Sequence, residues 1–300
     1  MQAERRAHFT GHQGSVYALC KLNEDEFLSG SGDHHLVKWN VNNEKEGTVW
    51  ATFPSGIYSL LYLKNNLLLA GTGNGEIHQV SFSEQKQQVV VNHHAQTVFA
   101  LQCVDSKGLI LACGGDGLFT VSDMETLQLI KSFSFGNFKV RCVLTDENNN
   151  ICYIGCGDGK VYILNLHSLT IVHQFHAHAE GFSVNALAVS PDGQFLYTAS
   201  RDARMNVFDV KNNYFKTDSV PAHNYAIYGI KYSPSNKIMA TVSRDKTAKL
   251  WNGGPMDFGL RLDKEKMNGH THSVNTLEWL NDTTLLTAGD DRSIIAWTIS

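Results

Sequence analysis

The sequence predicts an all-β fold made of seven repeated units. Apolar runs of one form recur seven times, from VYALCKL at Val16 to VNTLEWL at Val274, and each is followed by a second apolar run that ends in small residues. One polar turn residue closes each second run: Asp33, Asn74, Asp116, Asp158, Asp202, Asp245 and Asp291. Their mean spacing of about 43 residues is typical of propeller blades, whose period is about 40–45 residues. The sequence therefore predicts a single seven-bladed β-propeller of four-stranded antiparallel blades across residues 1–300.

The other strands follow from short β-rich runs within each repeat. A third strand follows every turn residue, from LVKWN in the first repeat to IIAWT in the last. Runs at 48–53, 89–92, 129–133 and 170–175 are interpreted as fourth strands, and the segment 252–266 as an insertion. The last repeat has no fourth strand of its own, and residues from about Arg5 to Thr10 occupy that position. We expect this N-terminal strand to pair with 293–299 and close the ring, because it would cover an exposed sheet edge.

Composition narrows the class of protein. The chain is 42% hydrophobic and 18% charged, and its 25 Lys+Arg against 29 Asp+Glu give a net charge of -4. These values exclude disorder and a basic nucleic-acid footprint. The N-terminus has no apolar signal segment and no stretch is long enough to span a bilayer, so we expect a soluble, cytoplasmic protein. The cysteines form no CxxC pair and are interpreted as reduced core residues: Cys20, Cys103, Cys113, Cys142, Cys152 and Cys156.

Three repeats carry a motif that resembles the GH…WD pattern of WD-repeat proteins. The matching residues are His12, Asp33 and Trp39, then His223, Asp245 and Trp251, and finally His270, Asp291 and Trp297. The resemblance implies that each set, with one Ser or Thr of the second strand, forms a buried hydrogen-bonded chain with a structural role. The candidate hydroxyls are Ser29 or Ser31, Thr241 or Ser243, and Thr287. The short chain resembles compact stand-alone members of the family, including uncharacterised bacterial ones.

The middle repeats depart from that pattern. The second repeat has Phe53, Asn74 and Val80 at the three positions, the third has His94, Asp116 and Ser122, and the fourth has Gly136, Asp158 and Leu164. The fifth has Phe208 in place of Trp, and its His is either displaced to His178 or lost. We therefore expect the second to fourth blades to depend more on apolar packing than on a polar chain.

No motif points to catalysis. The chain has no GxSxG, no HExxH and no phosphate-binding loop, and its glycine-rich segments 71–75 and 114–117 lie between strands rather than before a helix. His176 and His178 could share one face of a strand and reach a metal, but no Cys or carboxylate completes a site, and surface or structural roles are the alternative. We therefore expect no enzyme activity, no metal and no cofactor.

The resemblance also implies a binding surface on the narrow top face. In WD-repeat proteins that bind peptides there, contacts often come from the residue after the first-strand valine and from the residue before the turn Asp. From these two sets we select Tyr17, Tyr58, Phe99, Arg141, Arg201, Tyr228 and Arg244 as partner-binding residues. The aromatic residues predict an apolar or cationic group of the partner, and the arginines, with Lys139 nearby, predict a carboxylate. The alternative is that the rings plug the channel mouth and the arginines pair with Asp202 or Glu180.

These observations favour a non-enzymatic scaffold that binds a protein or peptide, and we expect the chain itself to be a monomer. The alternative is a small-molecule-binding or hydrolytic propeller with a site at the channel mouth. A nucleic-acid partner is disfavoured by the net charge, although Lys139, Arg141, Arg201, Arg204 and Arg244 could form a local basic patch.

Overall fold

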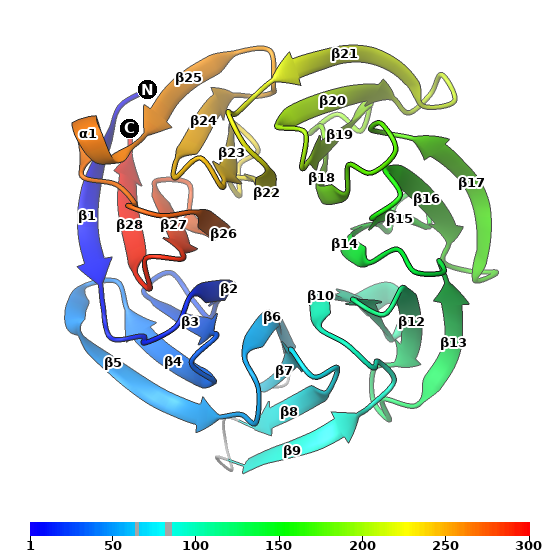
Figure 1. The fold of residues 1–300 in the computed structure, drawn as a ribbon, viewed down its shortest axis with the longest axis horizontal. Helices are drawn as coiled ribbons and strands as arrows, with labels where there is room; N and C mark the ends of the chain where they lie inside the picture. Colours follow the sequence, from blue (N-terminus) through cyan, green and yellow to red (C-terminus); the bar gives the residue numbers. More distant parts are fainter. Residues whose placement is uncertain (64–65, 82–85) are drawn as a thin grey trace. The chain divides into compact units, whose positions relative to one another are not determined.

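The computed structural model describes residues 1–63, 66–81 and 86–300. Over these ranges the strands form seven four-stranded sheets (Figure 1). The chain divides into two compact units: unit 1 is Met1–Pro54 with Ala188–Ser300, and unit 2 is Ser55–Leu187. The predicted number of sheets and their four-stranded form are confirmed in the described part of the chain. That residues 1–300 form a single domain stays a prediction.

Unit 2 holds three sheets whose strands follow one another in chain order. The first comprises β6 (Ile57–Leu63), β7 (Leu67–Thr72), β8 (Ile77–Ser81) and β9 (Lys86–Val91). The second comprises β10 (Val98–Val104), β11 (Leu109–Gly114), β12 (Leu118–Asp123) and β13 (Leu129–Ser134), with a 3-10 turn at Asp105–Lys107. The third comprises β14 (Val140–Asp146), β15 (Ile151–Cys156), β16 (Lys160–Asn165) and β17 (Thr170–His176).

Unit 1 holds the other four sheets, with its boundary falling inside β18. One comprises β2 (Val16–Lys21), β3 (Glu26–Ser31), β4 (His35–Asn40) and β5 (Asn43–Thr52). The next comprises β18 (Val184–Val189), β19 (Phe195–Ser200), β20 (Arg204–Asp209) and β21 (Phe215–Pro221). A further sheet comprises β22 (Ile227–Tyr232), β23 (Ile238–Ser243), β24 (Ala248–Asn252) and β25 (Phe258–Leu262), followed by α1 (Lys264–Met267). The last comprises β26 (Val274–Asn281), β27 (Thr284–Gly289), β28 (Ile294–Ile299) and β1 (Ala3–Phe9).

The N-terminal strand completes the last sheet, as the sequence predicts. β1 pairs antiparallel with β28, from Ala3 opposite Ile299 to Phe9 opposite Ile294, with a bulge between Arg5 and Ala7. Figure 1 shows the two chain ends side by side there. The first and last segments of the sequence are therefore held in one sheet.

The segment 252–266, predicted as an insertion, contains a strand of the regular fold. β25 pairs with β24 from Ala248 opposite Leu262 to Trp251 opposite Phe258, and α1 follows it. Asp263 caps that helical turn by accepting a hydrogen bond from the Lys266 backbone N–H. The sequence FGLRL contains a glycine and no β-branched residue, so pairing with β24 contributes more to this strand than local propensity does.

The core is the packing of neighbouring sheets within each unit. In unit 1, Leu277 and Trp279 pack with Leu250 of the preceding sheet. In unit 2, Leu69 and Val98 lie in one buried cluster and Leu111 and Ile154 in another. Such apolar contacts between sheets supply most of the stability, because each sheet alone is too small to bury its faces.

The turn between the second and third strands uses a left-handed residue in every sheet described. The residue after each turn Asp or Asn has positive φ: His34, Gly75, Gly117, Gly159, Ala203, Lys246 and Arg292. Glycine occupies this place in unit 2, and at Gly75 a Cβ would lie 2.2 Å from the His94 carbonyl oxygen. That close approach gives Gly75 a steric reason beyond its φ of 90°.

All six cysteines are free, and four of them are buried. Burial raises the pKa of Cys142, Cys152 and Cys156 to about 12, and that of Cys113 well above its usual range. Thiols in this state are inert, because the thiolate is the reactive form. In the described part of the chain, no helix is long and apolar enough to cross a membrane.

Candidate protein-interaction surface

A hydrogen-bonded chain of four side chains stiffens the first sheet of unit 1. His12 Nδ1 donates to Asp33 Oδ2 at 2.8 Å, because a carboxylate can only accept, and His12 Nε2 lies 2.7 Å from Ser29 Oγ. Trp39 Nε1 donates to the same Ser29 oxygen at 2.7 Å. Ser31 instead donates to the Gly14 carbonyl. Of the two predicted hydroxyls, Ser29 is therefore the member of the chain.

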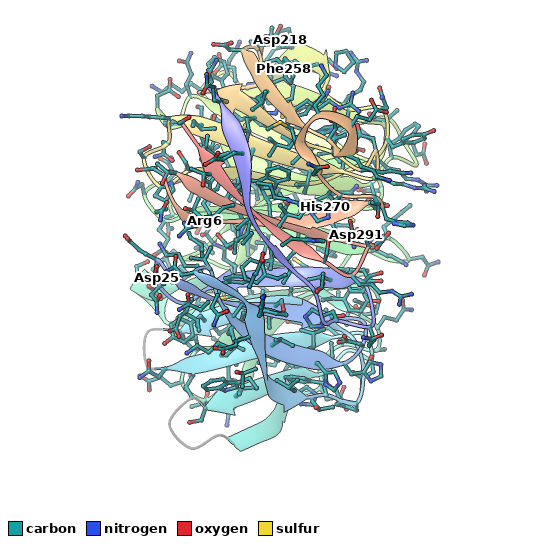
Figure 2. The ribbon with its side chains drawn as sticks, turned by 90° about the vertical axis from the view of Figure 1, so that its left-hand side faces the viewer. Arg6, Asp25, Asp218, Phe258, His270 and Asp291 are labelled. Atoms are coloured by element: carbon teal, nitrogen blue, oxygen red, sulfur yellow. The ribbon has the colours of Figure 1, made fainter. Side chains whose placement is uncertain are left out.

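Two more sheets of unit 1 repeat this arrangement. His223 lies 2.9 Å from Asp245 and 2.8 Å from Thr241, to which Trp251 also donates. The last sheet joins His270 to Asp291 at 2.9 Å and to Thr287 at 2.9 Å, and Trp297 donates to Thr287. Figure 2 shows His270 beside Asp291. Each chain is buried, so its polar groups are satisfied within the sheet rather than by water.

Unit 2 replaces these partners with residues of the third strand. His94 lies 3.3 Å from Asp116 and 3.2 Å from Thr120 of β12. In the next sheet, where no histidine precedes the strand, the hydroxyl of Tyr162 on β16 donates to Asp158 at 2.7 Å. Thr120 and Tyr162 both stand four residues after the turn Asp, a position that the sequence comparison overlooks. The polar chains of unit 2 are thus altered rather than simply lost.

Burial and hydrogen bonding together set the protonation states of these histidines and aspartates. Desolvation lowers the pKa of His12, His94 and His223 in spite of the neighbouring carboxylates, so these imidazoles are neutral near pH 7. Burial is the largest single influence on Asp245 and Asp291 and would raise their pKa values. The paired histidine, a neighbouring hydroxyl and a backbone N–H together outweigh it and hold both pKa values well below their usual range. The carboxylates are therefore ionised.

We expect stability to fall on acidification from pH 7.5 to pH 5. A histidine whose pKa is lowered by folding takes up protons more readily when unfolded, so its contribution is lost as pH drops below the unfolded pKa of about 6.5. The depressed carboxylate pKa values give the same sign below about pH 4. Melting temperature measured across this range tests the expectation, and the slope between pH 7.5 and 5 should be smaller in His223→Gln. A chain that melts higher at pH 5 than at pH 7.5 would contradict it.

The predicted partner-binding residues of unit 2 form one cluster. The rings of Tyr58 and Phe99 meet edge to face, with centroids 6.2 Å apart. The Arg141 guanidinium lies 4.2 Å from the Phe99 centroid, and the Lys139 ammonium lies 6.0 Å from it. Tyr58, Phe99 and Arg141 are half-buried and Lys139 is exposed. We call Tyr58, Phe99, Lys139 and Arg141 the aromatic–basic cluster.

Glycines make room for the two rings. A Cβ at Gly73 would lie 3.1 Å from Tyr58 Cε2, and one at Gly115 would lie 3.2 Å from Phe99 Cε2. These distances are shorter than ordinary van der Waals contacts, so a larger residue would displace the rings. The two sets of positions predicted from the sequence are therefore in contact in these two sheets. Each ring packs against the glycine that precedes the turn residue of its own sheet.

An exposed aromatic residue beside this cluster escaped the sequence analysis. Phe138, next to Lys139 in the loop before β14, is 45% exposed. The same loop of the following sheet carries Phe182, which is 40% exposed. The sequence carries a signal for both residues, because each stands two positions before the first-strand valine of its repeat. Solvent-exposed aromatics of this kind are typical of contact surfaces.

The predicted residues of unit 1 are more separate. Tyr17 packs over Gly32, where a Cβ would lie 3.3 Å from Tyr17 Cε2. Arg201, Tyr228 and Arg244 are exposed. Asn275 donates to Asp290 and to the Val16 carbonyl, which links two sheets of this unit. The expected alternative, rings that act as a plug, stays open.

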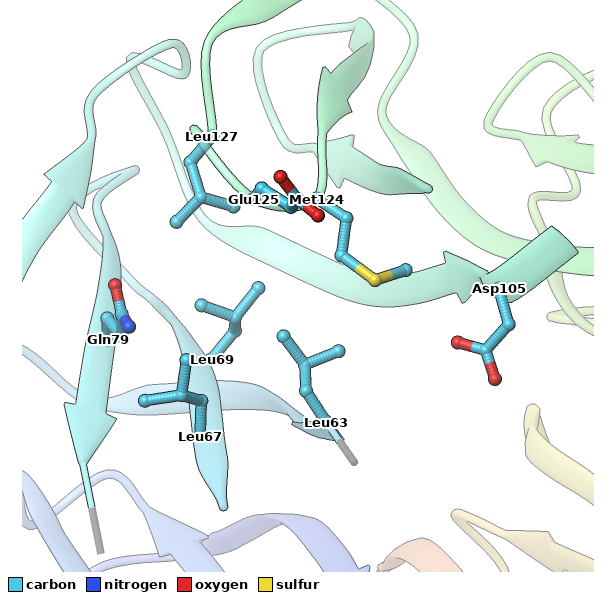
Figure 3. Close-up of a pocket in the computed structure, with 8 residues that line it drawn as sticks. All are labelled: Leu63, Leu67, Leu69, Gln79, Asp105, Met124, Glu125 and Leu127. Atoms are coloured by element: carbon cyan, nitrogen blue, oxygen red, sulfur yellow. The ribbon is translucent and has the colours of Figure 1, made fainter. Parts of the chain in front are cut away.

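The pocket of unit 2 is lined by none of the residues of the aromatic–basic cluster. Unit 2 has a pocket of about 610 Å³ at one seam between sheets (Figure 3), lined by Leu63, Leu67, Leu69, Gln79, Asp105, Met124, Glu125 and Leu127. Across residues 1–63, 66–81 and 86–300, no group of three or more His, Cys, Asp or Glu side chains is placed to hold a metal ion. Of the predicted pair, His176 is exposed at the end of β17, whereas His178 is buried beyond it.

Comparison with known proteins identifies the repeats. The family described as WD domain, G-beta repeat matches residues 3–40, 169–209, 215–252 and 263–298, which together cover just over half of the chain. The matched segments leave out most of unit 2, where the His and Trp positions are altered. The WD40 β-propeller domain of Doa1 has a similar structure, with a TM-score of 0.85 and 18% sequence identity over 100% of this chain and 97% of that one. The predicted seven-bladed propeller fold is confirmed by this likeness.

Several curated relatives are similar over most of the chain. Actin-interacting protein 1 of Caenorhabditis elegans is 24% identical over 96% of this chain, and WD repeat-containing protein 1-B of Xenopus laevis is 24% identical over 97%. This chain spans 47% of the length of each. A striatin homolog of Dictyostelium discoideum is 23% identical over 66% of this chain and 26% of its own length. With its family match, its seven four-stranded blades and its His–Ser/Thr–Trp–Asp chains, the protein belongs to the WD40-repeat family.

Proposed function

We propose that this chain is a non-enzymatic interaction scaffold and that its aromatic–basic cluster binds an acidic segment of a protein partner. The observation that carries the proposal is the stacking of the Arg141 guanidinium 4.2 Å from the Phe99 ring centroid. A guanidinium stacked in this way is held in place, so less conformational entropy is lost when it binds a carboxylate. Names of relatives, such as actin-interacting protein 1, describe a protein partner for those proteins.

The geometry of the cluster favours a carboxylate over a cationic group as the ligand. A cationic group would have to compete with Arg141 and Lys139 for the face of Phe99. A carboxylate meets two positive charges and a guanidinium whose planar fork fits it. Phe138, exposed next to Lys139, adds apolar area at the rim. The favoured ligand is therefore a peptide with an acidic residue beside an apolar one.

The test compares partner capture by the intact chain and by variants. Arg141→Gln should weaken a purified partner's binding by about thirtyfold, since an anchoring arginine contributes about 2 kcal/mol. Tyr58→Ala with Phe99→Ala should abolish co-purification from a native extract. Binding is measured by calorimetry and capture by mass spectrometry.

Controls separate binding from folding. Arg261→Gln, which removes a half-exposed arginine of unit 1 that pairs with Asp263, should leave capture unchanged. Melting temperatures of the Arg141 and Tyr58/Phe99 variants should stay close to that of the unaltered chain. Capture that is equal in all variants would refute the site, and a large loss of stability in the Tyr58/Phe99 variant would support the plug instead.

We also propose that the protein is cytoplasmic, because its six free cysteines suit a reducing compartment.

A further inference from the structure

A second surface lies in unit 1. There residues 252–257, which form the turn between β24 and β25, meet the preceding sheet, β18 to β21. We call it the β19–β24 seam. Its pocket of about 200 Å³ is lined by Phe195, Tyr197, Val207, Asp218, Asn252, Gly254, Pro255, Met256 and Asp257. The pocket of unit 2 uses the same positions, since Leu67, Leu69 and Gln79 correspond to Phe195, Tyr197 and Val207. An open seam is therefore a property of the repeat rather than an accident of one loop.

The pocket has a buried apolar floor and an exposed apolar rim. Tyr197 and Val207 are each 5% exposed and form the floor. Met256, which lines the pocket, is 68% exposed. Phe258, which follows the turn on β25 and packs against Trp251, is 52% exposed. Phe215 lies opposite Asp209, which lies opposite Phe195, so its side chain is on the face of the sheet that lines the pocket. Figure 2 labels Asp218 and Phe258 at this end of the molecule. So large a group of exposed apolar side chains is typical of a contact surface.

Backbone hydrogen bonds hold the turn in place. Asn252 N–H donates to the Asp257 carbonyl and Gly253 N–H to the Lys237 carbonyl, both at 2.8 Å. The Tyr232 hydroxyl donates to the Gly253 carbonyl at 2.8 Å. A Cβ at Gly254 would lie 3.4 Å from the Tyr197 hydroxyl oxygen, so the turn sits directly over the floor. The pocket is thus formed before any ligand arrives, which lowers the cost of binding.

Charge and size define the occupant. Two exposed carboxylates, Asp218 and Asp257, line the pocket, and none of its described lining residues is basic. Arg204 donates to Ser219 on the opposite face of the same sheet and does not neutralise them. A volume of about 200 Å³ is below the roughly 300 Å³ at which small-molecule pockets begin, but it suits one apolar side chain.

We propose that the β19–β24 seam binds a segment of a protein partner that inserts one apolar side chain beside Met256 and sets a Lys or Arg against Asp218 and Asp257. This charge preference is opposite to that of the aromatic–basic cluster. One scaffold can therefore hold two partner segments of opposite charge. The seam does not depend on the function proposed for unit 2, because no residue is shared.

The probe is a phage-displayed library of random dodecapeptides, selected on the full-length chain. Enriched peptides are synthesised and their affinity is measured by fluorescence anisotropy. Supporting peptides carry an apolar residue beside Lys or Arg and bind about tenfold more weakly to Asp218→Asn with Asp257→Asn, and to Met256→Gln. The matched control is Glu46→Gln with Val49→Gln, an exposed carboxylate and an exposed apolar side chain on β5, and it should leave affinity unchanged.

Two results would overturn the proposal. One is recovery only of peptides whose affinity is the same for the unaltered chain and for all seam variants. The other is a set of seam-dependent peptides that lack a basic residue or that bind more tightly when the carboxylates are removed. Because every substituted side chain is exposed, melting temperatures should stay within a few degrees, and this measurement confirms that lost affinity reflects the surface.

Discussion

Removal of residues 1–11 should abolish the cooperative unfolding transition of the full-length chain at its normal temperature and leave an aggregation-prone protein. The missing strand β1 pairs with β28 over its whole length, and its loss exposes an apolar edge. Phe9 is 1% exposed and packs edge to face on Phe27 and Trp39, with centroids 5.2 and 5.6 Å away. Both sheet pairing and core packing are therefore lost together. Calorimetry and light scattering measure the outcome.

Single substitutions divide this effect into its parts. Phe9→Ala should lower the free energy of unfolding by about 3–5 kcal/mol, because it leaves a cavity between two aromatic rings. Glu4→Ala, on the same strand but exposed, should change it by less than about 0.5 kcal/mol. A shortened chain that melts like the full-length one would show that β1 adds nothing to the last sheet.

The blades could be predicted from the sequence because each repeat contains a turn residue that marks where its strands end. Turn residues such as Asp33 and Asp245 end an apolar strand, and the spacing between them leaves room for four short strands and little else. β25 could not be predicted in the same way. Its residues FGLRL do alternate, but the run is only five residues long and contains a glycine. Its pairing with β24 also shifts register between Leu250 and Trp251, so the pattern alone does not define the strand.

The sequence could not decide which of two serines belongs to the polar chain of the first sheet, and only the structure shows it. Ser29 and Ser31 are two residues apart on one strand, so both point to the same face and both are small hydroxyls. Only the register places Ser29 against Trp39 and leaves Ser31 to the Gly14 carbonyl. The aromatic–basic cluster shows the same limit, since the sequence supplied Phe99 and Arg141 but could not show that one stacks on the other.

Asp245→Ala should destabilise the protein by about 3–5 kcal/mol, because it removes the ionised acceptor of several hydrogen bonds, each worth about 1.5–3 kcal/mol when one partner is charged. Asp245 accepts from His223 at 2.9 Å, from the Asn224 backbone N–H at 3.0 Å and from the Thr247 hydroxyl at 2.6 Å. All three donors would lose their acceptor at once. Urea unfolding followed by tryptophan fluorescence measures the change, because Trp251 belongs to the same chain.

The equivalent substitution in the second blade provides the contrast. Asn74 takes the place of the turn Asp, is exposed, and accepts from Thr72 within its own turn. Asn74→Ala should therefore cost no more than about 1 kcal/mol, the value of one ordinary hydrogen bond. Thr241→Val should fall between the two, since it removes the hydroxyl that joins His223 to Trp251. Equal losses for Asp245→Ala and Asn74→Ala would mean that the polar chain adds nothing beyond the turn, and that unit 1 depends on apolar packing between blades, as we expect for unit 2.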